Sequence, residues 1–195
     1  MTPDQARFVF EFLLPQLESE HATTRKILSS VPHELSSVPH ELSSVPHEKE
    51  SYRPDPKSKS ALELARHIAV VEIWFLDAVI NRRFGDADQL PAPVSTCHEI
   101  AQWYAENFTY RMPILNELSN DDLAARVNFI DLRKDPAVAY LNIAIRHSVH
   151  HRGQLSAYLR PMGARVPAIY VESADEPFPG NDGSTLAAEQ PPPAF

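Results

Sequence analysis

The chain has 195 residues and a formal net charge of −8, with 43% hydrophobic and 23% charged residues. These values fit one globular domain, and the lack of a Lys/Arg cluster argues against a nucleic-acid partner. One cysteine, Cys97, cannot form an internal disulfide, which suits a reducing compartment. No run approaches the ~20 apolar residues of a membrane helix, and the N-terminus does not resemble a signal peptide. We therefore expect a soluble, cytoplasmic protein with no membrane partner.

The first predicted element is a helix that Thr2 caps and Pro3 opens. Apolar residues follow at helical spacing as far as Leu28, and Pro15 is expected to bend this helix or mark a restart. Residues 29–48 then carry the unit SSVPHEL twice and almost a third time. Solenoid units are longer, so the repeat indicates a local duplication inserted in the first connection.

Capping boxes predict the next helices. A Ser-x-x-Glu box at Ser60 predicts a helix to about Arg83, and a Thr-x-x-Glu box at Thr96 predicts one to about Leu118. A short helical turn is expected after Ser119.

The last long helix is predicted to open at Asp135-Pro136 and to run to about Met162, with Gly163 as its stop. Long amphipathic helices in one domain predict an all-α fold, a four-helix bundle with a long connection after the first helix. We assign residues 1–171 to this bundle and residues 172–195 to an acidic, proline-rich tail.

Three histidines lie close together in "IRHSVHHRGQL". His147 and His151 are four residues apart, so they share one helix face and can reach one metal ion. His150 lies about 100° from His151 around the helix and is expected outside this pair. Arg152 is predicted to form an ion pair or a dimer contact. Core or surface histidines are the alternative for this spacing, and no Glu follows the first His as in the HExxH metalloprotease pattern.

A third histidine, His67, lies between Leu64 and Val71 on the apolar stripe of another helix. A buried imidazole needs a polar partner, and helical bundles build metal sites from facing helices. Two ligands from one helix and one from its neighbour would make a three-histidine shell. A core histidine bonded to the backbone is the alternative.

Other candidates carry weaker signals. Duplication alone explains the seven-residue spacing of His33, His40 and His47. His21 lies on the inward stripe of the first helix, where a core or rim position is favoured. Cys97 begins a helix, where the pKa of a thiol can fall, but no partner is evident and a structural role is preferred.

The segment "HSVHHRGQLSAYLRPMGARVP" resembles the closing helix of the DinB-like (DinB/YfiT-type) family of candidate metalloenzymes. The shared features are H-x3-H-R-G-Q, then an aromatic residue, Leu-Arg, and a glycine before "VP". "SALELARHIAVVEIWFLDAVI" is similar to the family's second helix, which supplies a single histidine, and "RPDPKSKSALELARHI" to its lead-in. The resemblance covers roughly residues 3–170. The repeat and the acidic tail are departures from the family pattern.

The resemblance implies a four-helix bundle, often a homodimer, that holds a divalent metal through His67, His147 and His151. Nickel, zinc or another first-row transition metal suits such nitrogen ligands. Some members are similar to thiol-dependent transferases that use bacillithiol or mycothiol. We therefore expect a metalloenzyme whose open metal position takes water or thiolate, for hydrolysis or thiol S-transfer, on a small-molecule substrate or with a thiol cofactor.

Two other functions stay open from the sequence. The first is a non-catalytic metal-binding or structural dimeric bundle, whose mark would be a fourth protein ligand such as His21 or Glu20. The second is a metal-free bundle that binds an apolar ligand. Elemental analysis of the purified protein separates the second from the metal-binding functions.

Overall fold

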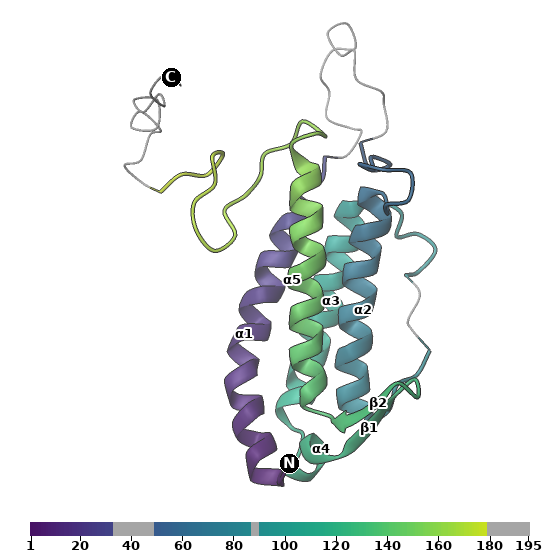
Figure 1. The fold of residues 1–195 in the computed structure, drawn as a ribbon, viewed down its shortest axis with the longest axis vertical. Coiled ribbons are helices and arrows are strands. Elements are labelled where there is room, and N and C mark those ends of the chain that lie inside the picture. Colours follow the sequence, from purple (N-terminus) through teal and green to yellow (C-terminus); the bar gives the residue numbers. More distant parts are fainter. Residues whose placement is uncertain (33–48, 87–89, 179–195) are drawn as a thin grey trace, which may run out of the picture.

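A computed structural model describes residues 1–32, 49–86 and 90–178 of the chain. Four long helices lie side by side in one bundle (Figure 1). α1 packs against α3 and α5, and α2 packs against α3 and α5. The predicted helical bundle is therefore confirmed, with the addition of one small hairpin. The helices are α1 (Pro3–Ser29), α2 (Ala61–Asn81), α3 (Cys97–Asn116), the short α4 (Asn120–Ala124) and α5 (Ala139–Leu159).

The predicted helix starts at Thr2, Ser60 and Thr96 are confirmed as capping boxes. In each box the cap hydroxyl accepts from the third helical N–H, and that residue's side chain accepts from the cap N–H. These exchanges satisfy backbone donors that the helix itself leaves unpaired. The same arrangement at Ser119 opens α4, as expected.

α1 runs from Pro3 to Ser29 without a restart at Pro15. Pro15 is exposed, so water can hydrate the carbonyl that loses its N–H donor. Leu13 and Leu17, on either side of it, are buried in the core and hold the helix in place. The prediction that Pro15 marks a helix restart is therefore wrong.

The predicted start of the last helix is also wrong. Asp135 and Pro136 end a strand, because β1 (Arg126–Phe129) and β2 (Arg133–Pro136) form an antiparallel hairpin in which Val127 pairs with Asp135. The turn is made by Ile130 and Asp131, with φ of 43° and 61°. Neither residue is the glycine that usually marks such a turn. α5 consequently begins at Ala139.

The C-terminal end of α5 also comes earlier in the chain than predicted. The helix ends at Leu159, before Met162. Gly163, with a φ of 75°, follows in the left-handed region, and its N–H donates to the carbonyl of Arg160 at 2.8 Å. Glycine adopts this conformation without steric cost, so it turns the chain out of the bundle as expected.

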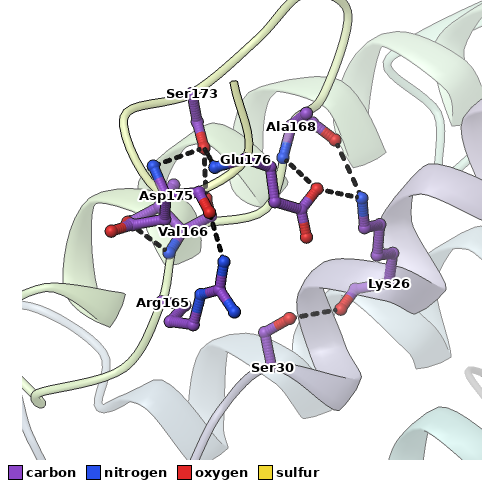
Figure 2. Close-up of polar contacts among 8 residues, drawn as sticks. All are labelled: Lys26, Ser30, Arg165, Val166, Ala168, Ser173, Asp175 and Glu176. Atoms are coloured by element: carbon purple, nitrogen blue, oxygen red, sulfur yellow. Dashed lines mark hydrogen bonds and ion pairs between the residues drawn. The ribbon is translucent and has the colours of Figure 1, made fainter. Parts of the chain in front are cut away.

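The segment after α5 folds back beside the end of α1 (Figure 2). Glu176 accepts from Lys26 of α1 at 2.6 Å and from the backbone N–H of Ala168 at 2.9 Å. The backbone N–H of Val166 donates to Asp175 at 2.9 Å. The predicted domain boundary after residue 171 falls within this bonded segment. Residues 179–195 of the predicted tail and residues 33–48 of the repeat lie outside the described residues.

The core lies where the inward faces of the four long helices meet. Among the described residues, no helix is long and apolar enough to cross a membrane. The largest fully buried apolar side chains are Phe10, Leu17, Ile27, Leu28, Leu64, Ile68, Ile73, Leu76, Ile100, Tyr104 and Tyr140.

Candidate metal centre

Three imidazoles converge between α2 and α5. The Nε2 atom of His67 lies 3.1 Å from Nε2 of His147 and 3.2 Å from Nε2 of His151. Each ring is half-buried. The rings meet edge to face, with centroids 4.4 to 4.8 Å apart. The helix-face prediction therefore places the three histidines correctly in one cluster.

The separation of these nitrogens suits a metal ion. An imidazole binds a first-row ion at roughly 2.0–2.1 Å, so two nitrogens of a tetrahedral shell lie about 3.3 Å apart. The observed separations are close to that value. Within the described ranges, these three residues are the one group of His, Cys, Asp or Glu side chains whose ligand atoms converge in this way. The cluster can bind a metal ion through its three Nε2 atoms.

The surroundings keep the cluster uncharged. Burial, followed by the positive charge that His151 would carry, lowers the pKa of His67 to about 4. The same causes, together with His67, lower the pKa of His147 to about 3. Burial also lowers the pKa of His151. A neutral imidazole is the form that binds a metal, so protons compete little with an ion at neutral pH.

Gln154 fixes the orientation of one imidazole. Its Oε1 atom lies 2.8 Å from Nδ1 of His151. Since a carbonyl oxygen can only accept, Nδ1 carries the proton and Nε2 keeps its lone pair for a metal. Nδ1 of His147 is buried and has no hydrogen-bond partner among the described residues.

The other predicted candidates lie outside this cluster. His150 is exposed and is not among the converging ligands, as expected, and its ring meets that of His151 edge to face with centroids 4.8 Å apart. Glu20 is paired with Arg152, at 2.6 Å, and does not join the cluster. Cys97 is buried, and its burial, with the nearby carboxylate of Glu50, raises the pKa of its thiol. The lowering of the thiol pKa that a helix start can cause is therefore wrong for Cys97, because the effect of burial on that pKa dominates. His33, His40 and His47 lie outside the described residues.

A second polar group, centred on Glu72 of α2, was not predicted. Glu72 of α2 is 1% exposed. It accepts hydrogen bonds from the hydroxyl of Tyr104, at 2.6 Å, and from the hydroxyl of Ser148. Its carboxylate also lies 3.5 Å from Nδ1 of His21, whose ring stacks on Phe108 with a centroid distance of 3.6 Å. His21 is thus a core residue, as the sequence favoured.

Arg152 continues this buried network. It is 1% exposed. Its guanidinium pairs with Glu20 at 2.6 Å, and donates to Thr24 at 3.3 Å and to the Tyr170 hydroxyl at 2.5 Å. The ion pair expected for Arg152 is therefore confirmed, and it joins α5 to α1 and to the segment after α5. We call Glu20, His21, Thr24, Glu72, Tyr104, Ser148 and Arg152 the buried polar network, which meets the exposed Tyr170 at the surface.

One sequence signal pointed to this network. Glu72 is the one acidic residue in the apolar run "AVVEIWF" of a predicted helix. A carboxylate on a buried helix face requires hydrogen-bond donors around it. The position of Glu72 therefore implied that other side chains donate to it. The partners themselves come from three other helices.

The fold and the cluster together define a class: a four-helix bundle with a three-histidine centre between two of its helices. The family model described as "DinB family" matches residues 21–181. The chain belongs to the DinB family. Because the match covers most of the chain, it includes both helices that supply the histidines.

Two curated relatives come from Bacillus subtilis. The chain is 29% identical to the uncharacterized protein YjoA over 125 residues, which is 63% of this chain and 79% of YjoA. It is 28% identical to the uncharacterized protein YrdA over 90 residues, which is 46% of this chain and 53% of YrdA. The second match therefore spans about half the length of that relative.

Solved structures give the same fold. A DinB-like protein from Bacillus cereus has a TM-score of 0.64 and 25% identity, covering 82% of this chain and 97% of that chain. The crystal structure of YjoA from Bacillus subtilis has a TM-score of 0.60 and 21% identity, covering 80% of this chain and 96% of that chain. The latter likeness supports the fold alone.

Proposed function

We propose that the protein is a divalent-metal-dependent enzyme that acts on a small molecule, with His67, His147 and His151 as the metal ligands. The observation that carries this proposal is the convergence of three neutral Nε2 atoms with no fourth protein ligand among the described residues. Structural zinc sites have four protein ligands, whereas catalytic sites keep one position for water or substrate. Nickel or zinc suits the all-nitrogen donor set.

When bound, the divalent ion supplies Lewis acidity, which lowers the pKa of a water or thiol at its open position. Hydrolysis and thiol S-transfer both use this effect. The three imidazoles add no negative charge, so the ion keeps its full charge for that purpose. The residues of the chain hold the ligands neutral by burial, and Gln154 keeps Nε2 of His151 directed into the cluster.

The non-catalytic alternative required a fourth protein ligand. Both residues that the sequence offered for it, His21 and Glu20, belong to the buried polar network instead. His21 lies 3.5 Å from Glu72 and Glu20 pairs with Arg152, and neither is among the ligand atoms that converge with the three imidazoles. This arrangement favours an open metal shell and hence turnover.

The test uses the full chain, stripped of metal with a chelator and reloaded with zinc or nickel. Elemental analysis should give one ion per chain. The loaded protein should then accelerate either the hydrolysis of an activated ester or the conjugation of a low-molecular-weight thiol with a chlorinated aromatic electrophile. In the conjugation, the thiolate forms the C–S bond and chloride leaves.

Matched variants decide the result. His67→Ala should abolish both metal retention and turnover, while His150→Ala should keep both. Metal retention without turnover in either assay would favour the non-catalytic alternative. Failure to retain any divalent ion would refute the metal site itself.

A further inference from the structure

A cavity of about 740 Å³ lies beside the candidate centre, between the segment 53–59 and the first turns of α2. His67 forms part of its wall, and Val71 and Leu90 add apolar surface. Cavities of roughly 300–1,000 Å³ are typical of small-molecule sites. The cavity is therefore large enough for a substrate whose other end reaches the histidine cluster.

The wall of this cavity is cationic, although the whole chain has a net charge of −8. Arg53, Lys57, Lys59 and Arg66 line it, and Glu63 is the one carboxylate among its lining residues. The carboxylate of Glu63 already has partners in the chain. It accepts from the N–H of Ser60 at 2.7 Å and lies 3.3 Å from Arg53. Positive charge is thus concentrated at this cavity in a chain whose net charge is negative.

The two lysines are held in place by the backbone around them. The N–H of Lys57 donates to Asp55 Oδ1 at 2.8 Å, and the N–H of Ser58 donates to the Asp55 carbonyl at 2.9 Å. The segment is tied to the start of α2 by the N–H of Ala61, which donates to the Tyr52 carbonyl at 2.9 Å. Among the described residues, the ammonium groups of the two lysines have no hydrogen-bond or ion-pair partner.

Lys59 connects the cationic wall to the histidine cluster. It precedes the helix cap, and His67 follows about two turns along α2, a rise of about 10 Å. Both Lys59 and His67 line the same cavity. A small molecule bound at Lys59 can therefore extend to the cluster.

We propose that this cavity is a subsite for the anionic group of the substrate, a small molecule that carries a carboxylate or a phosphate. This inference rests on the proposed metal-dependent function. Lysine and arginine are the side chains that bind such oxyanions, lysine as a point charge and arginine through its planar donors. The anion binds near Lys57 and Lys59, and the rest of the molecule lies over Val71 toward the histidines.

The experiment titrates the full chain with succinate and, separately, with inorganic phosphate, and follows backbone amide shifts by NMR. Both metal-free and metal-loaded protein are used, so that binding at the cavity is separated from binding to the ion. The two probes distinguish a carboxylate from a phosphate ligand. Saturable shifts at residues 57–59 and 66–67 are expected in both forms, and they should weaken as salt is added.

The test variant is Lys57→Gln combined with Lys59→Gln. Loss of two charges near the anion should weaken binding by about tenfold or more. Lys134→Gln is the control, because it removes an exposed lysine on β2, at the opposite end of the bundle from the start of α2 (Figure 1). The anion affinity of Lys134→Gln should stay within about twofold of that of the unaltered chain, since salt screens the effect of distant charges.

Two results overturn the subsite: no saturable shift with either anion, or equal binding by the double lysine variant and the unaltered chain. Metal-dependent turnover combined with either result leaves the proposed function standing and refutes the subsite alone. Lysine-dependent binding in a chain that retains no metal has the opposite meaning. It supports the anion site and refutes the proposed function.

Discussion

α5 carries polar residues in two different surroundings. His147 and His151 face α2, where their Nε2 atoms approach a third imidazole and their rings are half-buried. Ser148 and Arg152, each one residue further along, are buried and bonded to Glu72 and to Glu20. Adjacent residues in the sequence, about 100° apart around the helix, thus belong to different kinds of polar group.

The two groups differ in how their polar atoms are satisfied. In the buried polar network, donors meet acceptors and opposite charges pair, as a folded core requires, except at Nδ1 of His21, which lies 3.5 Å from the Glu72 carboxylate without a hydrogen bond. In the histidine cluster, three like nitrogens face one another and no acidic group balances them. The network needs nothing more than the chain itself, whereas the cluster becomes complete only with a cation. The first group supports the fold and the second is suited to a ligand.

The largest expected effect comes from breaking the network. Arg152→Ala leaves the Glu20 carboxylate without its cation in a mostly buried place. Removing one partner of a buried ion pair should lower the free energy of unfolding by about 3 kcal/mol. Urea unfolding of the metal-free protein measures it.

A matched arginine serves as the control for this prediction. Arg160 follows the last residue of α5 and pairs with Asp175 at 3.1 Å, but its side chain is 57% exposed. Arg160→Ala should change the free energy of unfolding by no more than about 1 kcal/mol. Equal effects of the two substitutions would show that the burial of Arg152 contributes no special stability.

Breaking the cluster should instead change metal affinity. His67→Ala, His147→Ala and His151→Ala should each weaken binding by about 100-fold or more, since loss of a ligand exceeds the effect of losing its orienting partner. His150→Ala should bind as the unaltered chain does. Competition with a chromophoric chelator gives the affinities. An empty site in His150→Ala, with metal retained in His147→Ala, would contradict the assignment of helix faces.

The pH dependence of stability should also reveal the cluster. The folded pKa values of His67 and His147, about 4 and about 3, lie below the ordinary value of 6.5. The unfolded chain therefore binds more protons in this interval, so the stability of the metal-free protein falls as pH drops from about 6.5 toward 4.

Thermal unfolding at a series of pH values tests this dependence, because the acidic groups with lowered pKa values titrate mainly below this window. His147→Leu should make the dependence shallower, since it removes one protonation that the folded state resists. Constant stability between pH 6.5 and 5 in the unaltered, metal-free chain would show that burial does not hold the imidazoles neutral.

The smallest expected effect belongs to Gln154, which touches the cluster without joining it. Gln154→Ala removes the acceptor from Nδ1 of His151, and metal affinity should fall by about tenfold. Gln102→Ala, on exposed α3 surface, is the control and should leave affinity unchanged. A loss as large as that of His151→Ala would mean that the amide is needed to form the site.

Much of the fold could be predicted from local patterns. The boxes at Ser60 and Thr96 predicted two helix starts correctly, because capping uses residues only three apart. The hairpin was missed, since its turn contains Ile130 and Asp131 in place of glycine. β1, Arg-Val-Asn-Phe, alternates polar and apolar residues over four positions alone, and β2, Arg-Lys-Asp-Pro, has no apolar alternation, so the local signal for a hairpin was weak.

The sequence by itself determined which histidines share a face. A spacing of four placed His147 with His151 and left His150 outside the pair, and the stripe around His67 pointed that residue inward. Helix periodicity is a local property, so these assignments needed no knowledge of the partner helix. The H-x3-H-R-G-Q segment also indicated the family, which the family model then showed.

Only the tertiary structure decided the rest. The approach of His67 to the α5 pair depends on how α2 packs against α5, and the two helices are joined through some sixty intervening residues. Arg152 is buried because Glu20, 132 residues earlier, meets it across the α1–α5 contact. Distances between elements come from packing of whole helix faces, and no spacing within one helix can specify them.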